Sequence, residues 1–212
     1  MKIWKNNMYR FVLAALPTLV VPVAATRPAW GQTSVVNDPV GDVDHKAPAF
    51  QDIVRGEIQK KGNSYILRME MATAIPANPP LPRPANSEIW WVWAFDLDPA
   101  TAPKGYPFAP GNKILTDFLV YVSWDGVQFK GYAIDRRPVP SGGSAIVTPV
   151  PFSIDGATVE AVLASALIGN VSSFGWGVRA LDVPSHIGTG AIQPVDSAPA
   201  FVGATPGYEP FP

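Results

Sequence analysis

Apolar and polar residues alternate along much of the chain, which is the pattern of strands with one buried face. In the segment 64–72 the odd-numbered residues are apolar, whereas Arg68 and Glu70 on the opposite face are charged. The segment 88–96 is apolar on both faces, which indicates a central strand or one whose second face meets a ligand. The same reasoning predicts further strands over residues 52–59, 118–124, 127–134, 152–154, 157–159 and 173–182.

Turn signals separate these segments. Asp125-Gly126 and Asp155-Gly156 predict two tight hairpins, because both residue types tolerate positive φ. One short helical turn is predicted over residues 163–168, and Gly169 ends it. Together these features predict an all-β fold, an antiparallel β-sandwich of jelly-roll type with one short helical turn and long loops rich in proline and glycine.

Composition narrows the chemistry that this fold can carry. The 212 residues include 24 prolines, 18 glycines and no cysteine, so disulfides, thiolate metal sites and a cysteine nucleophile are excluded. A formal net charge of -1, with only 16% charged residues, argues against nucleic acid as a partner.

The first residues have the layout of a secretory signal. Lys2, Lys5 and Arg10 occur without an acidic residue and precede an apolar run over residues 11–25, which is shorter than a membrane span. Small residues favour cleavage before Thr26 or before Gln32. We therefore predict a signal peptide over 1–31, a β-sandwich binding domain over 32–200 and a tail rich in proline and glycine over 201–212. The mature protein is expected in the periplasm, at the cell surface or in the medium, with no membrane span.

Signal removal changes the charge balance. If cleavage follows Gly31, four of the 16 basic residues leave, and 12 basic against 17 acidic residues give a net charge of -5.

Two acidic turns are candidate metal sites. Asp38 and Asp42 flank a Pro-Val-Gly turn, and Asp96 and Asp98 stand two apart at a predicted strand end. Calcium takes six to eight oxygen ligands, so closely spaced aspartates suit it. Two alternatives remain open: the aspartates cap their own turns, or Asp96 and Asp98 form the paired acids of a glycan hydrolase.

Tryptophan faces are candidate sugar-binding surfaces. Trp90 points away from Trp91 and Trp93 if the strand is regular. Trp124, beside the Asp125-Gly126 turn, is expected to be exposed, and Trp176 is the third candidate. Filling of the core is the alternative role for all three.

Several of these segments, in this order, resemble DOMON-like and family-9-like carbohydrate-binding modules of exported bacterial proteins. The resemblance spans residues 35–200 and is carried by five motifs: Asp38-Pro-Val-Gly-Asp42, the hairpin that begins at Asp52, Phe95-Asp-Leu-Asp-Pro-Ala-Thr101, Phe152 to Val162 with the Leu167-Ile-Gly169 turn, and Asp196-Ser-Ala-Pro199.

The resemblance implies a non-catalytic binding module for a carbohydrate or another envelope component. Some members hold structural calcium and bind sugars between tryptophans. By position, the resemblance makes Asp38, Asp42, Asp96 and Asp98 the calcium candidates. The sugar-stacking residues have no fixed motif in the family, so Trp90, Trp124 and Trp176 remain the candidates for that role. A glycan or an envelope protein is the expected partner, and the sequence does not indicate the oligomeric state. A second branch of the superfamily implies a redox alternative, a b-type haem between Met69 or Met71 and His186.

Overall fold

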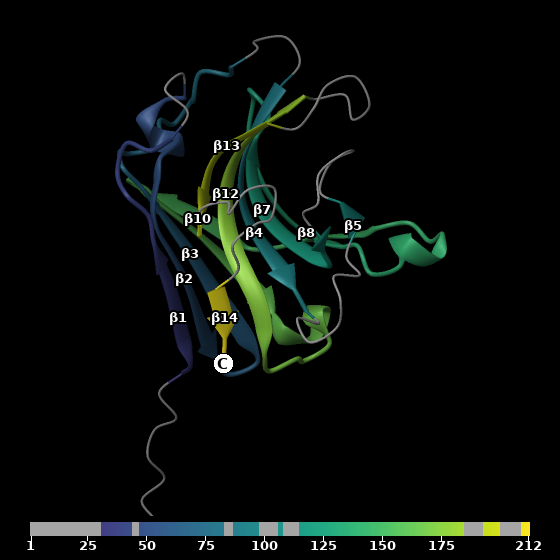
Figure 1. Ribbon diagram of the computed structural model, residues 1–212. Helices are drawn as coiled ribbons and strands as arrows, with labels where there is room; N and C mark the ends of the chain where they lie inside the picture. Colours follow the sequence, from purple (N-terminus) through teal and green to yellow (C-terminus); the bar gives the residue numbers. More distant parts are fainter. Residues whose placement is uncertain are drawn as a thin grey trace, which may run out of the picture. The chain divides into compact units, whose positions relative to one another are not determined.

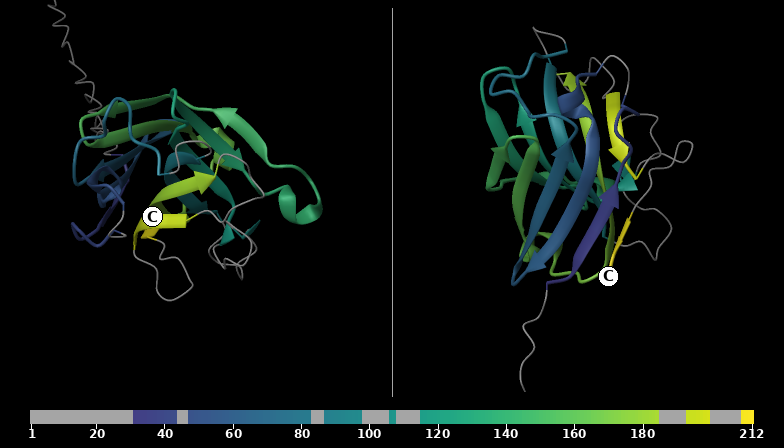
Figure 2. Two further views of the ribbon diagram at one scale, coloured as in Figure 1. Left: turned by 90° about the horizontal axis from the view of Figure 1, so that it is seen from above. Right: turned by 90° about the vertical axis from the view of Figure 1, so that its left-hand side faces the viewer.

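Two antiparallel sheets form the fold, as the all-β prediction requires (Figures 1 and 2). The computed structural model describes residues 31–43, 47–82, 87–97, 106–107, 115–184, 193–199 and 209–212. In these ranges the only helical elements are three 3-10 turns: η1 (Ala49–Gln51), η2 (Val139–Ser141) and η3 (Ser165–Ile168). No helix in the described part of the chain is long and apolar enough to cross a membrane.

The first sheet has five strands. Their spatial order is β1 (Thr33–Asn37), β2 (Ile53–Lys61), β3 (Ser64–Met71), β11 (Thr158–Ala164) and β10 (Phe152–Asp155). The β2–β3 and β10–β11 pairs are hairpins, so the sheet joins two segments that lie far apart in the sequence.

The second sheet has seven strands, with β4 near its centre. Its order is β13 (Gln193–Ala198), β12 (Phe174–Pro184), β4 (Ser87–Asp96), β7 (Phe118–Trp124), β8 (Phe129–Asp135) and β9 (Ile146–Pro149), and β14 (Glu209–Phe211) pairs with the first part of β12. A separate pair consists of β5 (Tyr106–Pro107) and β6 (Leu115–Thr116).

Large aromatic side chains fill the space between the sheets. Trp91, Trp93 and Trp176 are completely buried there. The Trp176 indole donates a hydrogen bond to Ser34 Oγ on β1 at 2.9 Å, and the Trp93 indole donates to the Arg68 carbonyl on β3 at 3.3 Å. These two bonds satisfy buried donors and connect the sheets.

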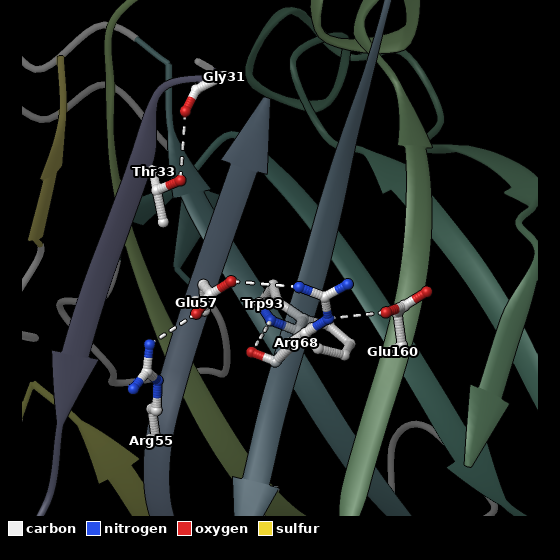
Figure 3. A network of polar contacts seen from close by, with 7 residues as sticks. All are labelled: Gly31, Thr33, Arg55, Glu57, Arg68, Trp93 and Glu160. Atoms are coloured by element: carbon white, nitrogen blue, oxygen red, sulfur yellow. Dashed lines mark hydrogen bonds and ion pairs between the residues drawn. The ribbon is translucent and has the colours of Figure 1, made fainter. Parts of the chain in front are cut away.

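The outer faces of the two sheets differ in chemistry. Charged side chains cover the outer face of β2, β3 and β11, where Glu57 and Glu160 both pair with Arg68 (Figure 3). The outer face of the seven-stranded sheet instead carries a second buried apolar cluster: Val92, Ala94, Leu119, Tyr121, Leu181 and Val183.

The central position predicted for the strand at 88–96 is confirmed, because β4 pairs with both β7 and β12. The predicted helical turn is present as η3, and Gly169 ends it with a φ of 75°. The Asp125-Gly126 hairpin also forms, but its loop runs from Asp125 to Gln128 rather than over two residues. Asp125 Oδ1 accepts the amides of Val127 and Gln128, which stabilises the longer loop.

Six short strands were not predicted: β1, β5, β6, β9, β13 and β14. β14 lies within the segment expected to be a tail, and Phe211 is completely buried. Its ring stacks on Phe174 at a centroid distance of 4.8 Å, so these last residues belong to the sandwich. The predicted signal peptide lies outside the described residues, apart from Gly31.

Candidate functional site

Asp38, Asp42 and Asp196 bring their carboxylates together beside the edge strand β13. One oxygen from each lies within 4.8 Å of the other two. Asp38 directly follows β1, and its amide donates to the Val54 carbonyl on β2 at 3.1 Å. Strand pairing therefore fixes the first member of the cluster.

Asp52 is the fourth carboxylate of this region. It lies between η1 and β2 and is only 3% exposed. Its Oδ2 accepts the Gly41 amide at 2.9 Å, which holds the turn between Asp38 and Asp42. Gly41 has a φ of 89°, a conformation that glycine adopts without strain, so this turn requires a glycine.

A β-bulge positions Asp196. Its strand pairs Ala180 with Asp196 but Leu181 with Pro194, so Val195 is the extra residue. Asp196 is 8% exposed, and its two oxygens accept the amides of Ile53 at 2.5 Å and Ser197 at 2.7 Å. This carboxylate thus reaches from the seven-stranded sheet to the first residue of β2 in the other sheet.

The cluster contains unmatched negative charge. Burial, followed by the neighbouring Asp196 and Asp42, raises the pKa of Asp38 to about 7. Burial also raises the pKa of Asp196 to about 6, although the Ile53 and Ser197 amides oppose the shift. In the described part of the chain, no lysine or arginine forms an ion pair with these aspartates.

Two oxygens of the cluster also lack hydrogen-bond partners. Asp38 Oδ2 and Asp52 Oδ1 are buried without a donor among the described residues. Buried carboxylate oxygens are almost always paired or bound to a metal. An all-oxygen donor set, with oxygens spaced within about 5 Å (twice a calcium–oxygen bond length), fits a hard divalent cation.

Of the four predicted metal ligands, the structure brings Asp38 and Asp42 into one site and leaves Asp96 away from it. Asp96 pairs with Gly175 on β12, five residues along the strand from the Ala180 partner of Asp196. At about 3.3 Å per residue this separation is roughly 16 Å. Asp98 lies outside the described residues.

Asp52 and Asp196 are site residues that the sequence did not reveal as ligands. Both lie in motifs that carry the family resemblance, but tertiary structure brings them to Asp38: the pairing of β1 with β2 places Asp52, and the packing of β13 beside β2 places Asp196.

The predicted exposure of Trp124 is wrong. Trp124 is 4% exposed and packs on Phe129 at a centroid distance of 4.7 Å, because its side chain points between the sheets. Trp176 is completely buried. Neither ring has a face free for a ligand, and both fill the core.

Trp90 is the one candidate tryptophan on an outer face. It is half-buried on β4 and stacks on Tyr121 of β7, with ring centroids 4.1 Å apart. Tyr121 in turn lies 5.8 Å from Tyr132 of β8, so the three rings form an aromatic band across three strands. Alternation along the segments 118–124 and 127–134 is the sequence signal for this band, because it places both tyrosines opposite the core face.

Polar groups border this aromatic band. The Trp90 indole donates to Glu88 Oε2 at 2.6 Å. Lys130 on β8 bonds Asp125 Oδ2 at 2.6 Å. Burial, with Glu88 and Tyr132 adding to it, raises the pKa of Tyr121 to about 12, so its hydroxyl stays protonated near neutral pH. The band therefore combines apolar ring surface with hydrogen-bonding groups at its border.

The methionines of the haem alternative lie in the core. Met69 and Met71 are 0% and 2% exposed among apolar side chains between the sheets. His186 lies outside the described residues.

Comparisons with known proteins give no relative. No family model, curated protein or solved structure matches the chain.

Proposed function

We propose that this chain is an exported, non-catalytic binding module that calcium stabilises and whose ligand is a carbohydrate or another envelope component. The observation that carries the proposal is the convergence of Asp38, Asp42 and Asp196 with the buried Asp52. The predicted secretory signal supports export. Outside the cell calcium is abundant enough to fill weak sites of this kind.

Calcium would bind the oxygens of Asp38, Asp42 and Asp196. Asp52 adds negative charge that acts on Asp38 and Asp196. The ion supplies positive charge that offsets the repulsion among these carboxylates. Calcium accepts irregular oxygen geometries, whereas magnesium requires a near-ideal octahedron, and these ligands come from a turn and a β-bulge. The bound ion would link the segment after β1 to β13 and so stabilise the contact between the sheets.

The calcium proposal is tested by thermal unfolding of metal-stripped protein with calcium, with magnesium and with neither. We expect calcium to raise Tm and magnesium to have a smaller effect. Asp196→Asn should abolish the calcium effect, whereas Asp155→Asn, which changes an exposed aspartate on β10, should retain it. Superimposable curves for the wild type with and without calcium would refute the proposal.

The ring surfaces of the half-buried Trp90 and Tyr132 in the aromatic band are the ligand site that we propose. Tyr121, which is only 8% exposed, lies between them and contacts both rings. Sugars bind proteins through the apolar faces of their rings and through hydroxyl groups, and Trp90 with Glu88 offers both kinds of contact. Trp90 is held in place by Tyr121 and Glu88, which reduces the ordering cost on binding.

Affinity electrophoresis tests this site with gels that contain soluble β-glucan, xylan, mannan or glycol chitin. We expect at least one polysaccharide to retard the wild type. Trp90→Ala should then run as in an empty gel, and Arg68→Ala on the outer face of the other sheet should remain retarded. Retardation by none of the four, or equal retardation of Trp90→Ala and the wild type, would contradict the proposal.

A further inference from the structure

The edge strand β9 exposes apolar side chains. Ile146 and Val147 are 55% and 56% exposed, and Phe152, at the start of β10, is 37% exposed. β9 pairs with β8 on one side, and no described strand pairs with its other side. The hairpin that contains η2 and leads into β9 extends away from the body of the sandwich (Figures 1 and 2).

The hydrogen-bond register determines which backbone groups of β9 face outward. Val150 donates to the Gly131 carbonyl, so this pair is a hydrogen-bonded pair of the ladder. Such pairs alternate in an antiparallel ladder, so Thr148 and Ile146 also bond to β8. The backbone groups of Val147 and Pro149 therefore point to the free edge, and Pro149 has no N–H to donate.

Charge does not protect this edge. The stretch from Pro138 to Ile154 contains no charged residue. Edge strands are usually protected by their shortness, by lysine, by proline or by an inward-pointing charge. β9 carries no charge, and Pro149 protects only the last of its four positions. Removal of the predicted signal leaves a net charge of -5, so two copies repel one another over most of their surfaces. The β9 edge is neutral, so two such edges can meet without bringing like charges into contact.

We propose that β9 is a dimer interface at which two copies of this chain pair antiparallel about a two-fold axis at Val147. Each Val147 donates its N–H to the carbonyl of Val147 in the second copy and accepts the equivalent bond. Pro149 is compatible with this register, because its carbonyl can still accept a hydrogen bond from the second copy. A two-fold axis at Pro149 itself is excluded, because proline has no N–H to donate. A second copy fits the edge because the pattern of donors, acceptors and neutral side chains is self-complementary about Val147.

Pairing at β9 would make the two seven-stranded sheets continuous. The two-fold axis is perpendicular to the sheet, so both aromatic bands would lie on the same side. This consequence rests on the proposed function, and it predicts stronger retention on long polysaccharides than on short oligosaccharides through avidity. The dimer itself does not depend on carbohydrate binding.

Sedimentation equilibrium tests the interface with Val147→Lys and the matched control Val127→Lys. Both substitutions place a lysine at an exposed valine, and Val127, in the β7–β8 loop, is 82% exposed. We expect a reversible dimer for the wild type and for Val127→Lys and a monomer for Val147→Lys. A monomeric wild type at high protein concentration, or equal dimerisation of both variants, would overturn the proposal.

A single-cysteine experiment tests the register and does not depend on an added charge. The chain has no cysteine, so Val147→Cys carries the only thiol. Paired residues in this register have Cα atoms about 5.5 Å apart, within the range of a disulfide. Val147→Cys should form a disulfide-linked dimer roughly tenfold faster than Val127→Cys at equal concentration. Equal rates would exclude this register, whether or not the lysine variants fold.

Discussion

Two groups of charged side chains in this molecule differ in how their charges are balanced. On the outer face of the five-stranded sheet, Arg68 bonds Glu160 at 2.8 Å and Glu57 at 3.2 Å, so opposite charges alternate across adjacent strands (Figure 3). At β13, Asp38, Asp42, Asp52 and Asp196 have the same charge, and two of the four are almost completely buried. The first group is matched within the protein, whereas the second needs a proton or a cation from outside.

The energies of the two groups differ accordingly. The Arg68 side chain is 42% exposed, and ion pairs of this kind contribute about 0–1 kcal/mol each. Carboxylates that are buried without a partner cost several kcal/mol, unless a proton or metal neutralises them. The contribution of the aspartate cluster to the free energy of unfolding should therefore depend on calcium and pH. The contribution of the surface network should be small and should depend only weakly on salt.

Removal of calcium should have the largest effect. With free calcium at about a hundred times its Kd, binding adds about 2.7 kcal/mol to the free energy of unfolding. For a domain of this size that is about 5–10 °C in Tm, measured by calorimetry with and without chelator. If calcium shifted the Tm of Asp196→Asn by the same amount, calcium would act at another site and the contrast between the two charged groups would fail.

The effect of Asp38→Asn on the free energy of unfolding should have opposite signs with and without calcium. The amide removes one of the repelling charges, so the metal-stripped variant should be more stable than the wild type by about 1 kcal/mol at pH 8. In saturating calcium the variant should be less stable, because a ligand is lost. Urea unfolding under the two conditions measures both differences, and an unchanged sign would contradict the assignment of Asp38 as a ligand.

The metal-stripped protein should lose stability as pH rises. The folded-state pKa values of Asp38 and Asp196, about 7 and about 6, lie above 3.8, the ordinary value for aspartate. Their protonation therefore stabilises the fold fully below about pH 4, and that stability is lost as pH rises through 6 and 7. We expect the free energy of unfolding to fall by about 1 kcal/mol between pH 5 and pH 8, after allowance for solvent screening. Urea midpoints that rise over this interval would count against the cluster.

Glu57→Gln should have the smallest effect. It removes one carboxylate from the surface network and should lower the free energy of unfolding by about 0.5 kcal/mol, equally with and without calcium. The loss should shrink at 1 M salt, where charges are screened over about 3 Å. Urea unfolding at two salt concentrations checks this, and a calcium-dependent loss would link the two groups.

Alternation allowed most of the fold to be predicted, and the failures have physical causes. The long strands at 64–71 and 87–96 have clear patterns, because one or both faces pack in the core. The short strands β13 and β14 contain proline and span few residues, so they leave no periodic signal and depend on β12 for pairing. Trp124 was expected to be exposed because it precedes a turn, but its side chain points between the two sheets and is buried there.

The aspartate cluster could be predicted only in part. Asp38 and Asp42 share a turn and were found from their spacing, but Asp196 comes from a strand 154 residues after Asp42. The β-bulge at Val195 and the packing of β13 on β2 are tertiary features that local spacing does not encode. The sequence thus indicated the acidic turn but not the partner that completes it.

Isothermal titration of metal-stripped protein with calcium tests the central claim most directly. The cluster predicts one ion bound per chain by the wild type and by Asp155→Asn, and none by Asp196→Asn. Absence of binding by the wild type, or full binding by a folded Asp196→Asn variant, would contradict the assignment of this site.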